Sequence, residues 1–129
     1  MTDTERILQH YKEPYHQHKP PKPDDFYFFN IGRAENPLCD DWIRCWVRVT
    51  TGEPKIIHGV WWEGHGCCFS QAAASMVAKH FEGKTLVEGR AFTQDDMLEL
   101  FQFNIEPDRI ECVMVSLNAA HDALEDIPV

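Results

Sequence analysis

The chain is predicted to form an α+β domain, a three-stranded antiparallel sheet with helices packed on one face. Alternating strand patterns occupy residues 26–63, and helical spacing of apolar residues begins after residue 66. The strand candidates are joined by short links, which favour antiparallel pairing of neighbours. With 129 residues, 43% of them hydrophobic, the chain can bury one core. We therefore expect a single domain over residues 1–129.

The N-terminal segment is expected to form a short helix followed by a connector. Thr2 or Thr4 can cap the helix, and Pro14 ends it. Residues 16–25, HQHKPPKPDD, are polar and proline-rich, which is typical of a connector. We expect residues 1–25 to be partly mobile.

Three strands are predicted at residues 26–31, 42–49 and 55–63. The middle strand alternates most clearly. Its two faces carry Ile43, Cys45, Val47 and Val49 on one side, and Trp42, Arg44, Trp46 and Arg48 on the other. In the third strand, Trp61 and Trp62 point to opposite faces. One is expected in the core, and the other is expected to be an exposed anchor for a partner.

The remainder of the chain is predicted to be helical. A helix that begins near residue 67 stops at Gly83, and residues 84–92 form a short helix or turn. Thr93 and Asp96 are spaced as a capping box, and Pro107 suits the first turn of a last helix. The apolar stripe of that last helix consists of Ile110, Val113, Met114, Leu117, His121 and Leu124.

The charge and the N-terminal sequence limit the possible partners and compartments. The formal net charge is −9 and the pI is about 5.1, which argues against nucleic acid and anionic membrane surfaces as partners. The N-terminal residues are charged, unlike a signal peptide, and no apolar run approaches the roughly 18 residues of a membrane span. We expect a cytoplasmic protein with reduced cysteines.

Two of the five cysteines differ clearly in their surroundings. Cys45 is in phase with the apolar face of its strand, which predicts a packed core thiol. Cys112 lies about 200° around the helix from Ile110 and so falls off the apolar stripe. It also follows shortly after Pro107, near a helix start, where backbone amides favour a thiolate.

Two further segments place cysteines at positions suited to chemistry. In GHGCCFSQ, Cys67 lies where a Gly-x-Gly turn enters a helix, which suits a metal ligand, a sulfur nucleophile or a tightly packed thiol. In NPLCDDW, Cys39 and Asp41 offer one soft and one hard ligand, a combination that suits zinc or iron. No zinc-ribbon or zinc-finger spacing is present.

The chain contains five short motifs, in this order: ILQHYKEP, NPLCDDWI, GHGCCFSQAAASM, EGKTL and PDRIEC. Together they resemble the NifU-type iron–sulfur assembly scaffolds, including the IscU and SufU branches. ILQHYKEP resembles the opening helix of that family, and NPLCDDWI resembles its Asn-Pro-x-Cys-x-Asp turn. GHGCCFSQAAASM and EGKTL resemble the next two family motifs, and PDRIEC resembles the last one. The motifs occur in the family's order over nearly the whole chain.

The resemblance implies a carrier and not an enzyme. It implies that Cys39, Cys67 and Cys112 are cluster ligands, with Asp41 as the exchangeable fourth ligand. Sulfur would arrive at Cys67 or Cys112 from a PLP-dependent cysteine desulfurase. A transient [2Fe–2S] cluster would then pass to apo iron–sulfur proteins, and the carrier would be a monomer or a weak dimer. Cys68 stands where the family has a small or polar residue, so it is an extra thiol, either packed or an alternate ligand.

The sequence departs from each branch of the family. Glu111 stands where the IscU branch has a histidine before its last cysteine. The SufU branch also lacks that histidine, and there the Cys/Asp set holds Zn²⁺ and the protein accepts sulfur. The stretch between Cys67 and Cys112 looks too short for the insertion of that branch. IEPD, residues 105–108, replaces the chaperone-recognition segment of IscU.

Two other functions are compatible with these residues. One is a zinc-binding sulfurtransferase that accepts persulfide sulfur, which Glu111 favours. The other is a thiol hydrolase that uses Cys67 with His65 or His58 as the base. His65 can also approach a metal at Cys67 or simply be a solvated turn residue. Lys84 and Arg109 can balance cluster charge, contact a partner or carry ordinary surface charge.

Overall fold

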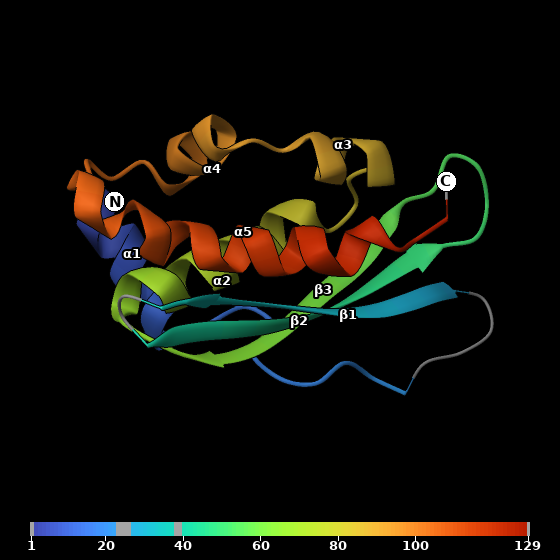
Figure 1. Ribbon diagram of the computed structural model, residues 1–129, viewed down its shortest axis with the longest axis horizontal. Coiled ribbons are helices and arrows are strands. Elements are labelled where there is room, and N and C mark those ends of the chain that lie inside the picture. Colours follow the sequence, from blue (N-terminus) through green and yellow to red (C-terminus); the bar gives the residue numbers. More distant parts are fainter. Residues whose placement is uncertain (1, 23–26, 38–39, 129) are drawn as a thin grey trace.

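The computed structural model describes residues 2–22, 27–37 and 40–128, and it shows a three-stranded sheet covered by helices (Figure 1). The elements in chain order are α1 (Asp3–Lys12), β1 (Tyr27–Asn36), β2 (Asp41–Thr50), β3 (Ile57–His65), α2 (Cys68–Phe81), α3 (Leu86–Ala91), α4 (Gln94–Phe101), the short 3₁₀ helix η1 (Pro107–Arg109) and α5 (Ile110–Glu125). The predicted fold class is confirmed.

The sheet has the order β1-β2-β3 with both pairs antiparallel. β1 runs to Asn36, beyond the predicted end at residue 31, because it stays paired with β2 as far as Asn36 opposite Asp41. Its second half includes Gly32, where a Cβ atom would lie only 2.8 Å from Cα of Ala123. The glycine lets α5 approach the backbone of β1, so the strand lacks an apolar side chain where the helix crosses it.

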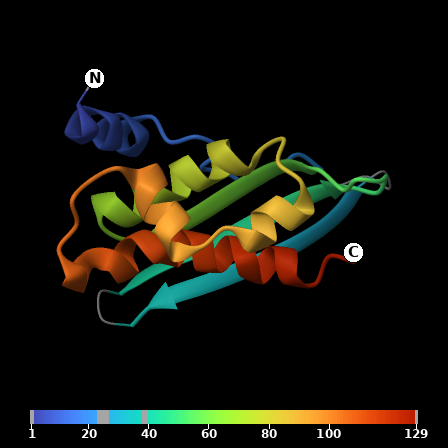
Figure 2. The ribbon, with the colours of Figure 1, turned by 90° about the horizontal axis from the view of Figure 1, so that it is seen from above.

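Helices α2 and α5 pack against one face of the sheet, and α3 and α4 form a further layer over α5 (Figure 1). Because α5 is enclosed between the sheet and this outer layer, its burial is wider than the predicted stripe. The buried set also includes Cys112, Val115, Ser116, Ala119, Ala120 and Ala123. Seen from above, α1 lies beside α2, at the edge of the helices that cover the sheet (Figure 2).

The connector between α1 and β1 contacts the opposite face of the sheet. On that face, a guanidinium N–H of Arg48 donates to the carbonyl of Pro21 at 2.9 Å. The His16 ring stacks on Trp61 with centroids 5.0 Å apart. Trp61 is therefore buried like Trp62, and the expected exposed tryptophan anchor is wrong. The mobility expected for residues 1–25 stays a prediction.

Local capping explains where several helices begin. Thr2 caps α1 by accepting a hydrogen bond from the N–H of Glu5. The predicted capping box at Thr93 and Asp96 is present at the start of α4. Within the described residues, no helix combines the length and the apolar character that a membrane crossing requires.

Candidate metal centre

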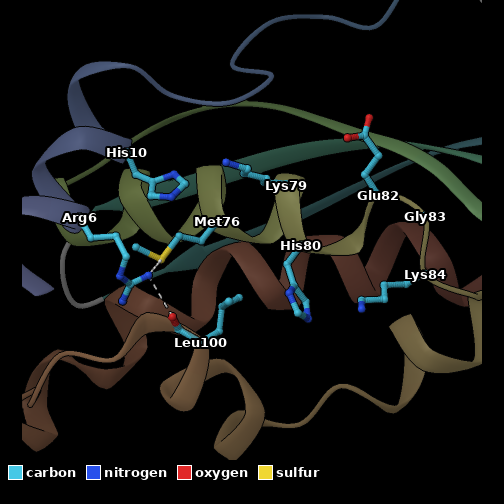
Figure 3. Close-up of a pocket in the computed structure, with 9 residues that line it drawn as sticks. All are labelled: Arg6, His10, Met76, Lys79, His80, Glu82, Gly83, Lys84 and Leu100. Carbon is cyan, nitrogen blue, oxygen red and sulfur yellow. Dashed lines mark hydrogen bonds between the residues drawn. The ribbon is translucent and has the colours of Figure 1, made fainter. Parts of the chain in front are cut away.

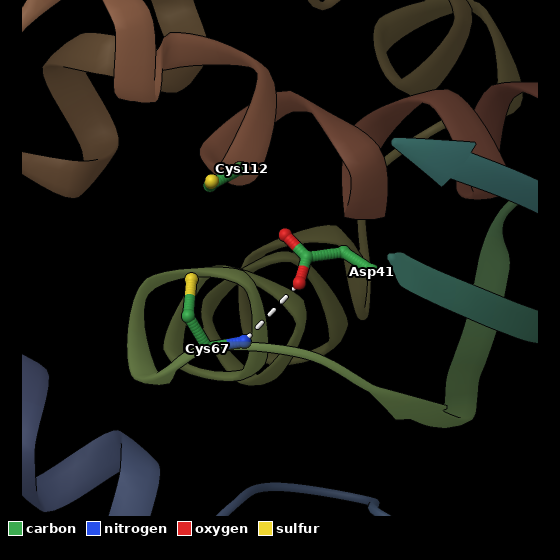
Figure 4. Close-up of side chains that lie close together, drawn as sticks. All are labelled: Asp41, Cys67 and Cys112. Atoms are coloured by element: carbon green, nitrogen blue, oxygen red, sulfur yellow. Dashed lines mark hydrogen bonds between the residues drawn. The ribbon is translucent and has the colours of Figure 1, made fainter. Parts of the chain in front are cut away.

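Three side chains from separate elements meet at one end of the sheet. They are Asp41 at the start of β2, Cys67 immediately before α2, and Cys112 in the first turn of α5. One ligand atom from each lies within 4.8 Å of those of the other two. Figure 4 shows the two sulfur atoms and the carboxylate directed toward a common space. We call these residues the thiol–carboxylate group.

The Asp41 carboxylate is buried, with 2% of the residue exposed. Its Oδ1 accepts a hydrogen bond from the backbone N–H of Cys67 at 3.2 Å. Its Oδ2 is buried and has no hydrogen-bond partner among the described residues. A buried carboxylate oxygen without a partner is costly, and a cation beside it would remove that cost.

Cys67 is the N-cap residue of α2, where the helix's first amides are free to donate. Burial alone would raise the pKa of its thiol. Hydrogen bonds from the backbone N–H groups of Ser70 and Phe69, and from the Arg109 guanidinium, outweigh burial and the nearby Asp41 charge, so the pKa is lowered. Cys67 is also half-buried, so a reactant can reach it. These features are typical of a reactive thiolate.

Cys112 is almost fully buried, with 1% of the residue exposed, yet it is not part of the hydrophobic core cluster. Its sulfur lies 3.8 Å from Nδ2 of the buried Asn36, which donates toward it. Cys112 was predicted to lie off the apolar stripe of the last helix, but α5 buries it, and its neighbour at the end of β1 is polar.

Arg109 is the positive group of this centre. Its guanidinium interacts with the thiols of Cys67 and Cys112, which raises the pKa of the arginine further. The same group lies over the Phe69 ring, 5.1 Å from its centroid, and Phe69 in turn packs edge-on against Phe101. Aromatic packing thus positions a fixed positive charge beside both sulfurs.

The residues present fit a thiophilic cation. Two thiolates and a carboxylate are ligands used for zinc and for iron–sulfur centres. Ligand atoms about 2.0–2.3 Å from one tetrahedral ion lie about 3.3–3.8 Å apart, so a group within 4.8 Å needs little closure. The unpartnered Asp41 Oδ2 is the atom that such an ion would satisfy.

The other candidate residues of the sequence lie elsewhere. Cys39 is outside the described residues, whereas Asn36, three positions earlier in the sequence, and the ligand candidate Asp41 are both described at this centre. Among described residues, the group does not include Cys68, His65 or Glu111. His65 and Glu111 are exposed, which places neither side chain in the centre.

Cys45 lies in the core as predicted, with 2% of the residue exposed. Burial raises the pKa of its thiol to about 12. Its sulfur therefore stays protonated and inert at neutral pH.

Sequence reasoning did not identify Asn36 and Ser70 as neighbours of the thiols. Asn36 is the first residue of the Asn-Pro-x-Cys motif, but the motif alone does not indicate that this side chain contacts Cys112. Ser70 is fully buried three residues after Cys67, and its hydroxyl donates to the Cys67 carbonyl at 2.9 Å. A small polar residue in the first turn after the thiol was the available signal.

Comparison with known proteins places this centre in context. The sequence pattern of the NifU-like N terminal domain matches residues 2–128. The chain is 26% identical over 121 residues to the bifunctional protein NifU/MnmA of Rubrobacter xylanophilus, spanning 94% of this chain but only 23% of that protein. It is 22% identical over 123 residues to the iron–sulfur cluster assembly scaffold protein IscU 1 of Archaeoglobus fulgidus, spanning 95% and 74%.

Solved structures show the same fold. A putative iron–sulfur cluster assembly scaffold protein for the SUF system, from Fervidobacterium islandicum, superposes with a TM-score of 0.71 at 20% identity, covering 93% of this chain and 94% of the other. The N-terminal part of a NifU-like protein from Brucella abortus superposes with a TM-score of 0.67 at 18% identity, covering 93% and 90%. Because the family pattern extends over almost the whole chain, this protein belongs to the NifU-like N-terminal domain family of iron–sulfur cluster assembly scaffolds.

Proposed function

We propose that this protein accepts sulfur from a PLP-dependent cysteine desulfurase, assembles a transient [2Fe–2S] cluster and transfers it to apo-proteins in a reducing cytoplasm. The observation that carries the proposal is the convergence of Asp41, Cys67 and Cys112, with a buried carboxylate oxygen that has no partner. Cys39 is proposed as the third thiolate ligand on its motif alone. The protein acts as a carrier, as a monomer or a weak dimer, and the cluster is its cargo.

Cys67 is proposed as the first sulfur acceptor. Its lowered pKa and partial exposure allow its thiolate to attack the outer sulfur of the desulfurase persulfide. A new S–S bond forms at Cys67, and the desulfurase cysteine leaves as a thiolate. Conversion of that sulfur to sulfide takes two electrons, which we assign to an external dithiol or a low-potential electron carrier. Buried Cys112 is the alternative acceptor after sulfur has entered.

Asp41 and Arg109 are proposed to tune how firmly the cargo is held. A carboxylate oxygen is a harder ligand than a thiolate and binds iron less firmly, so Asp41 provides the exchangeable position that a recipient needs. Arg109 is not a ligand candidate, because a guanidinium carries no acceptor. Its charge offsets the negative charge of bound thiolates and sulfide.

The test is an anaerobic reconstitution with ferrous iron, cysteine, dithiothreitol and a cysteine desulfurase. Visible charge-transfer absorption with equal iron and acid-labile sulfide supports the proposal. Cys67→Ser and Cys112→Ser are expected to lose the cluster. Cys45→Ser is the matched control: it removes a thiol outside the group, so it is expected to cost stability and retain the cluster. Loss of cluster in folded Cys45→Ser, or its retention in both ligand variants, refutes this ligand assignment.

A zinc-binding sulfurtransferase is the second candidate. Two observations favour it: the three ligand atoms can all reach one tetrahedral ion, and Glu111 points to solvent where the IscU branch has a histidine. In this case Zn²⁺ would be held by Cys39, Asp41, Cys67 and Cys112, and Cys67 would accept persulfide sulfur. The same experiment separates the two functions. One bound zinc per chain, faster desulfurase turnover and no visible absorption identify the sulfurtransferase.

A further inference from the structure

A cavity of about 420 Å³ lies between α1, the last turns of α2 and the end of α4. Its lining includes five basic side chains from three segments: Arg6 and His10 from α1, Lys79 and His80 from α2, and Lys84 after it (Figure 3). We call this the basic cavity. Cys67 lies at the other end of the 14-residue helix α2, which is about 21 Å long, so the cavity is separate from the thiol–carboxylate group.

The basic cavity contrasts with the rest of the protein. The chain carries 21 acidic and 12 basic Lys and Arg residues, yet among the described residues Glu82 is the one acidic residue that lines this space. The Tyr15 hydroxyl donates a hydrogen bond to the Glu82 carboxylate. Among the described residues, the ion pairs found join Arg33, Arg44 and Lys55 to glutamates, and none involves a cation of the cavity.

The C-terminal end of α2 explains only part of this cluster. Lys79 and His80 lie in the last turn of α2, where positive charge offsets the helix dipole. Arg6 and His10 come from another helix, and Lys84 lies beyond the helix end. Three basic side chains therefore remain to be explained.

Arg6 is held in place by the end of α4. Its guanidinium donates to the carbonyl of Leu100 at 3.2 Å and also to the carbonyl of Phe101. Carbonyl partners fix the group without neutralising its charge, because they are themselves uncharged. A guanidinium has five N–H donors, so others stay available toward the cavity.

The neighbouring positive charges affect both histidines. The pKa of His10 is lowered by burial first and then by the charges of Lys79 and Arg6. The pKa of His80 is lowered by burial and then by Lys84. Each imidazole therefore lies among cations that favour its neutral form.

Acidic residues near His80 have other partners. Glu88 and Asp96 line a neighbouring cavity that shares His80 and Lys84. The carboxylate of Glu88 accepts the backbone N–H of Thr85, and that of Asp96 accepts the backbone N–H of Thr93. Both carboxylates therefore take part in helix caps and stay charged, and the pKa of Glu88 is lowered first by its Thr85 hydrogen bonds and then by the charge of Lys84.

We propose that the basic cavity binds a small phosphate-bearing anion. A phosphate group accepts several N–H donors at once, which suits a fixed guanidinium, two lysines and two imidazoles. The volume is in the range of small-molecule sites, and Met76 and Leu100 provide apolar surface for an organic part of the ligand. The inference goes beyond the scaffold function and does not depend on it.

The test is calorimetric titration of the full chain with inorganic pyrophosphate and, separately, with adenosine diphosphate, in about 0.15 M salt to screen weak surface contacts. Saturable binding of one ligand per chain is expected. The double variant Lys79→Gln and Lys84→Gln is expected to weaken binding at least about tenfold, a loss of about 1.4 kcal/mol. Lys12→Gln with Lys19→Gln is the matched control, because it removes the same charge from exposed lysines outside the cavity.

Glu82→Gln is expected to increase the affinity for pyrophosphate, a change that misfolding would not produce. It removes the one acidic group of the cavity and keeps an oxygen that can accept from Tyr15, so pyrophosphate is expected to bind several-fold more tightly. Cys67→Ser is expected to bind pyrophosphate like the unmodified protein, which separates this site from the metal centre.

Three results would overturn the proposal. The first is no saturable binding of either phosphate compound up to about 10 mM, a concentration far above the Kd of a specific site. The second is an equal loss of affinity in the control variant, and the third is binding of citrate or an oligoglutamate peptide in place of the phosphate compounds, which would assign the cavity to carboxylates.

Discussion

The backbone N–H of Cys67 donates a hydrogen bond to Oδ1 of Asp41, and this bond joins the start of β2 to the N-terminus of α2 (Figure 4). One carboxylate oxygen is thereby committed to the protein, and Oδ2 is left for a cation. The carboxylate can release an ion from Oδ2 without disturbing the position of Cys67. This arrangement suits a ligand that must be exchanged.

Replacing Asp41 is expected to slow release of a bound cluster. Asp41→Ala removes the exchangeable ligand, so recipient thiolates lose their point of entry, and transfer to an apo-ferredoxin is expected to slow about tenfold, or about 1.4 kcal/mol of barrier. The measurement is the half-time of transfer followed by circular dichroism. Asp41→Asn keeps an oxygen for the Cys67 N–H and separates loss of the ligand from loss of that bond. Transfer at the original rate in both variants would remove Asp41 from the ligand set.

Gly66 is expected to be essential for the position of Asp41. A Cβ atom at residue 66 would lie 2.6 Å from Asp41 Oδ1 and would also clash with Ser70 Oγ. Gly66→Ala is therefore expected to displace the carboxylate and weaken zinc binding by about 10–100-fold, as is typical when the support of a ligand is lost. Competition with a chromophoric chelator measures the affinity. Gly52→Ala is the control, since a Cβ there meets nothing within 4 Å; equal affinities for the two variants would contradict the prediction.

The two kinds of thiol are expected to differ strongly toward iodoacetamide. Cys67 has a lowered pKa and is half-buried, whereas burial raises the pKa of Cys45 to about 12. The metal-free protein is labelled at about pH 7.5, where ordinary cysteine thiols are mostly protonated. Cys67 is expected to be labelled before Cys45, which is expected to react only after unfolding. Peptide mass spectrometry after timed quenching measures each site.

Arg109→Gln provides the matched test of why Cys67 is reactive. Removal of the guanidinium takes away a hydrogen bond that lowers the pKa of Cys67, so the labelling rate is expected to rise at higher pH than in the unmodified protein. Arg33→Gln changes the same charge on an exposed side chain whose ion-pair partner is Glu35 and not a thiol. A labelling profile unchanged in Arg109→Gln would show that backbone donors alone activate Cys67.

The stability of the domain is expected to fall below pH 6.5, partly through His121. Burial lowers the pKa of His121 below its ordinary 6.5, although its hydrogen bond to the Gly89 carbonyl opposes this shift. As pH falls through 6.5, the His121 imidazole binds a proton in the unfolded chain before it does so in the folded chain, so protonation favours unfolding. Stability is therefore full above pH 6.5 and declines below it.

His121→Gln keeps a donor toward Gly89 and removes the titration. Urea unfolding at several pH values between 7.5 and 5, on either side of the ordinary histidine pKa, is expected to show a smaller acid loss in this variant. His10 and His80 also have lowered pKa values, so the loss is reduced and not abolished. An identical loss in variant and unmodified protein would exclude His121 as a contributor.

Sequence patterns predicted those elements whose signals are local. The alternation in β2 gave its buried face correctly, and the capping box at Thr93 marked the start of α4 because a cap depends on residues three apart. The second half of β1 was missed because its extent is set by pairing with β2 and by the approach of α5 over Gly32. Neither cause is visible within the strand itself.

The centre was only partly predictable for the same reason. The motifs identified Asp41, Cys67 and Cys112, and the structure brings these three together. Arg109 was left between several roles, because its neighbours Phe69 and Cys67 come from a distant segment, although Cys112 follows it by three residues. One tryptophan of the Trp61–Trp62 pair was expected to be exposed, because the stacking of His16 over Trp61 is a contact between residues distant in sequence.

The separation of Asp41, Cys67 and Cys112 along the chain also affects how the protein matures. Half-built chains have no centre, because β2, α2 and α5 must all be in place before the three ligand atoms meet. An ion that binds only the finished domain adds a free energy of RT ln(1 + [ion]/Kd) to folding. Binding of the ion therefore distinguishes fully folded chains from incomplete ones, and it stabilises only the folded chains.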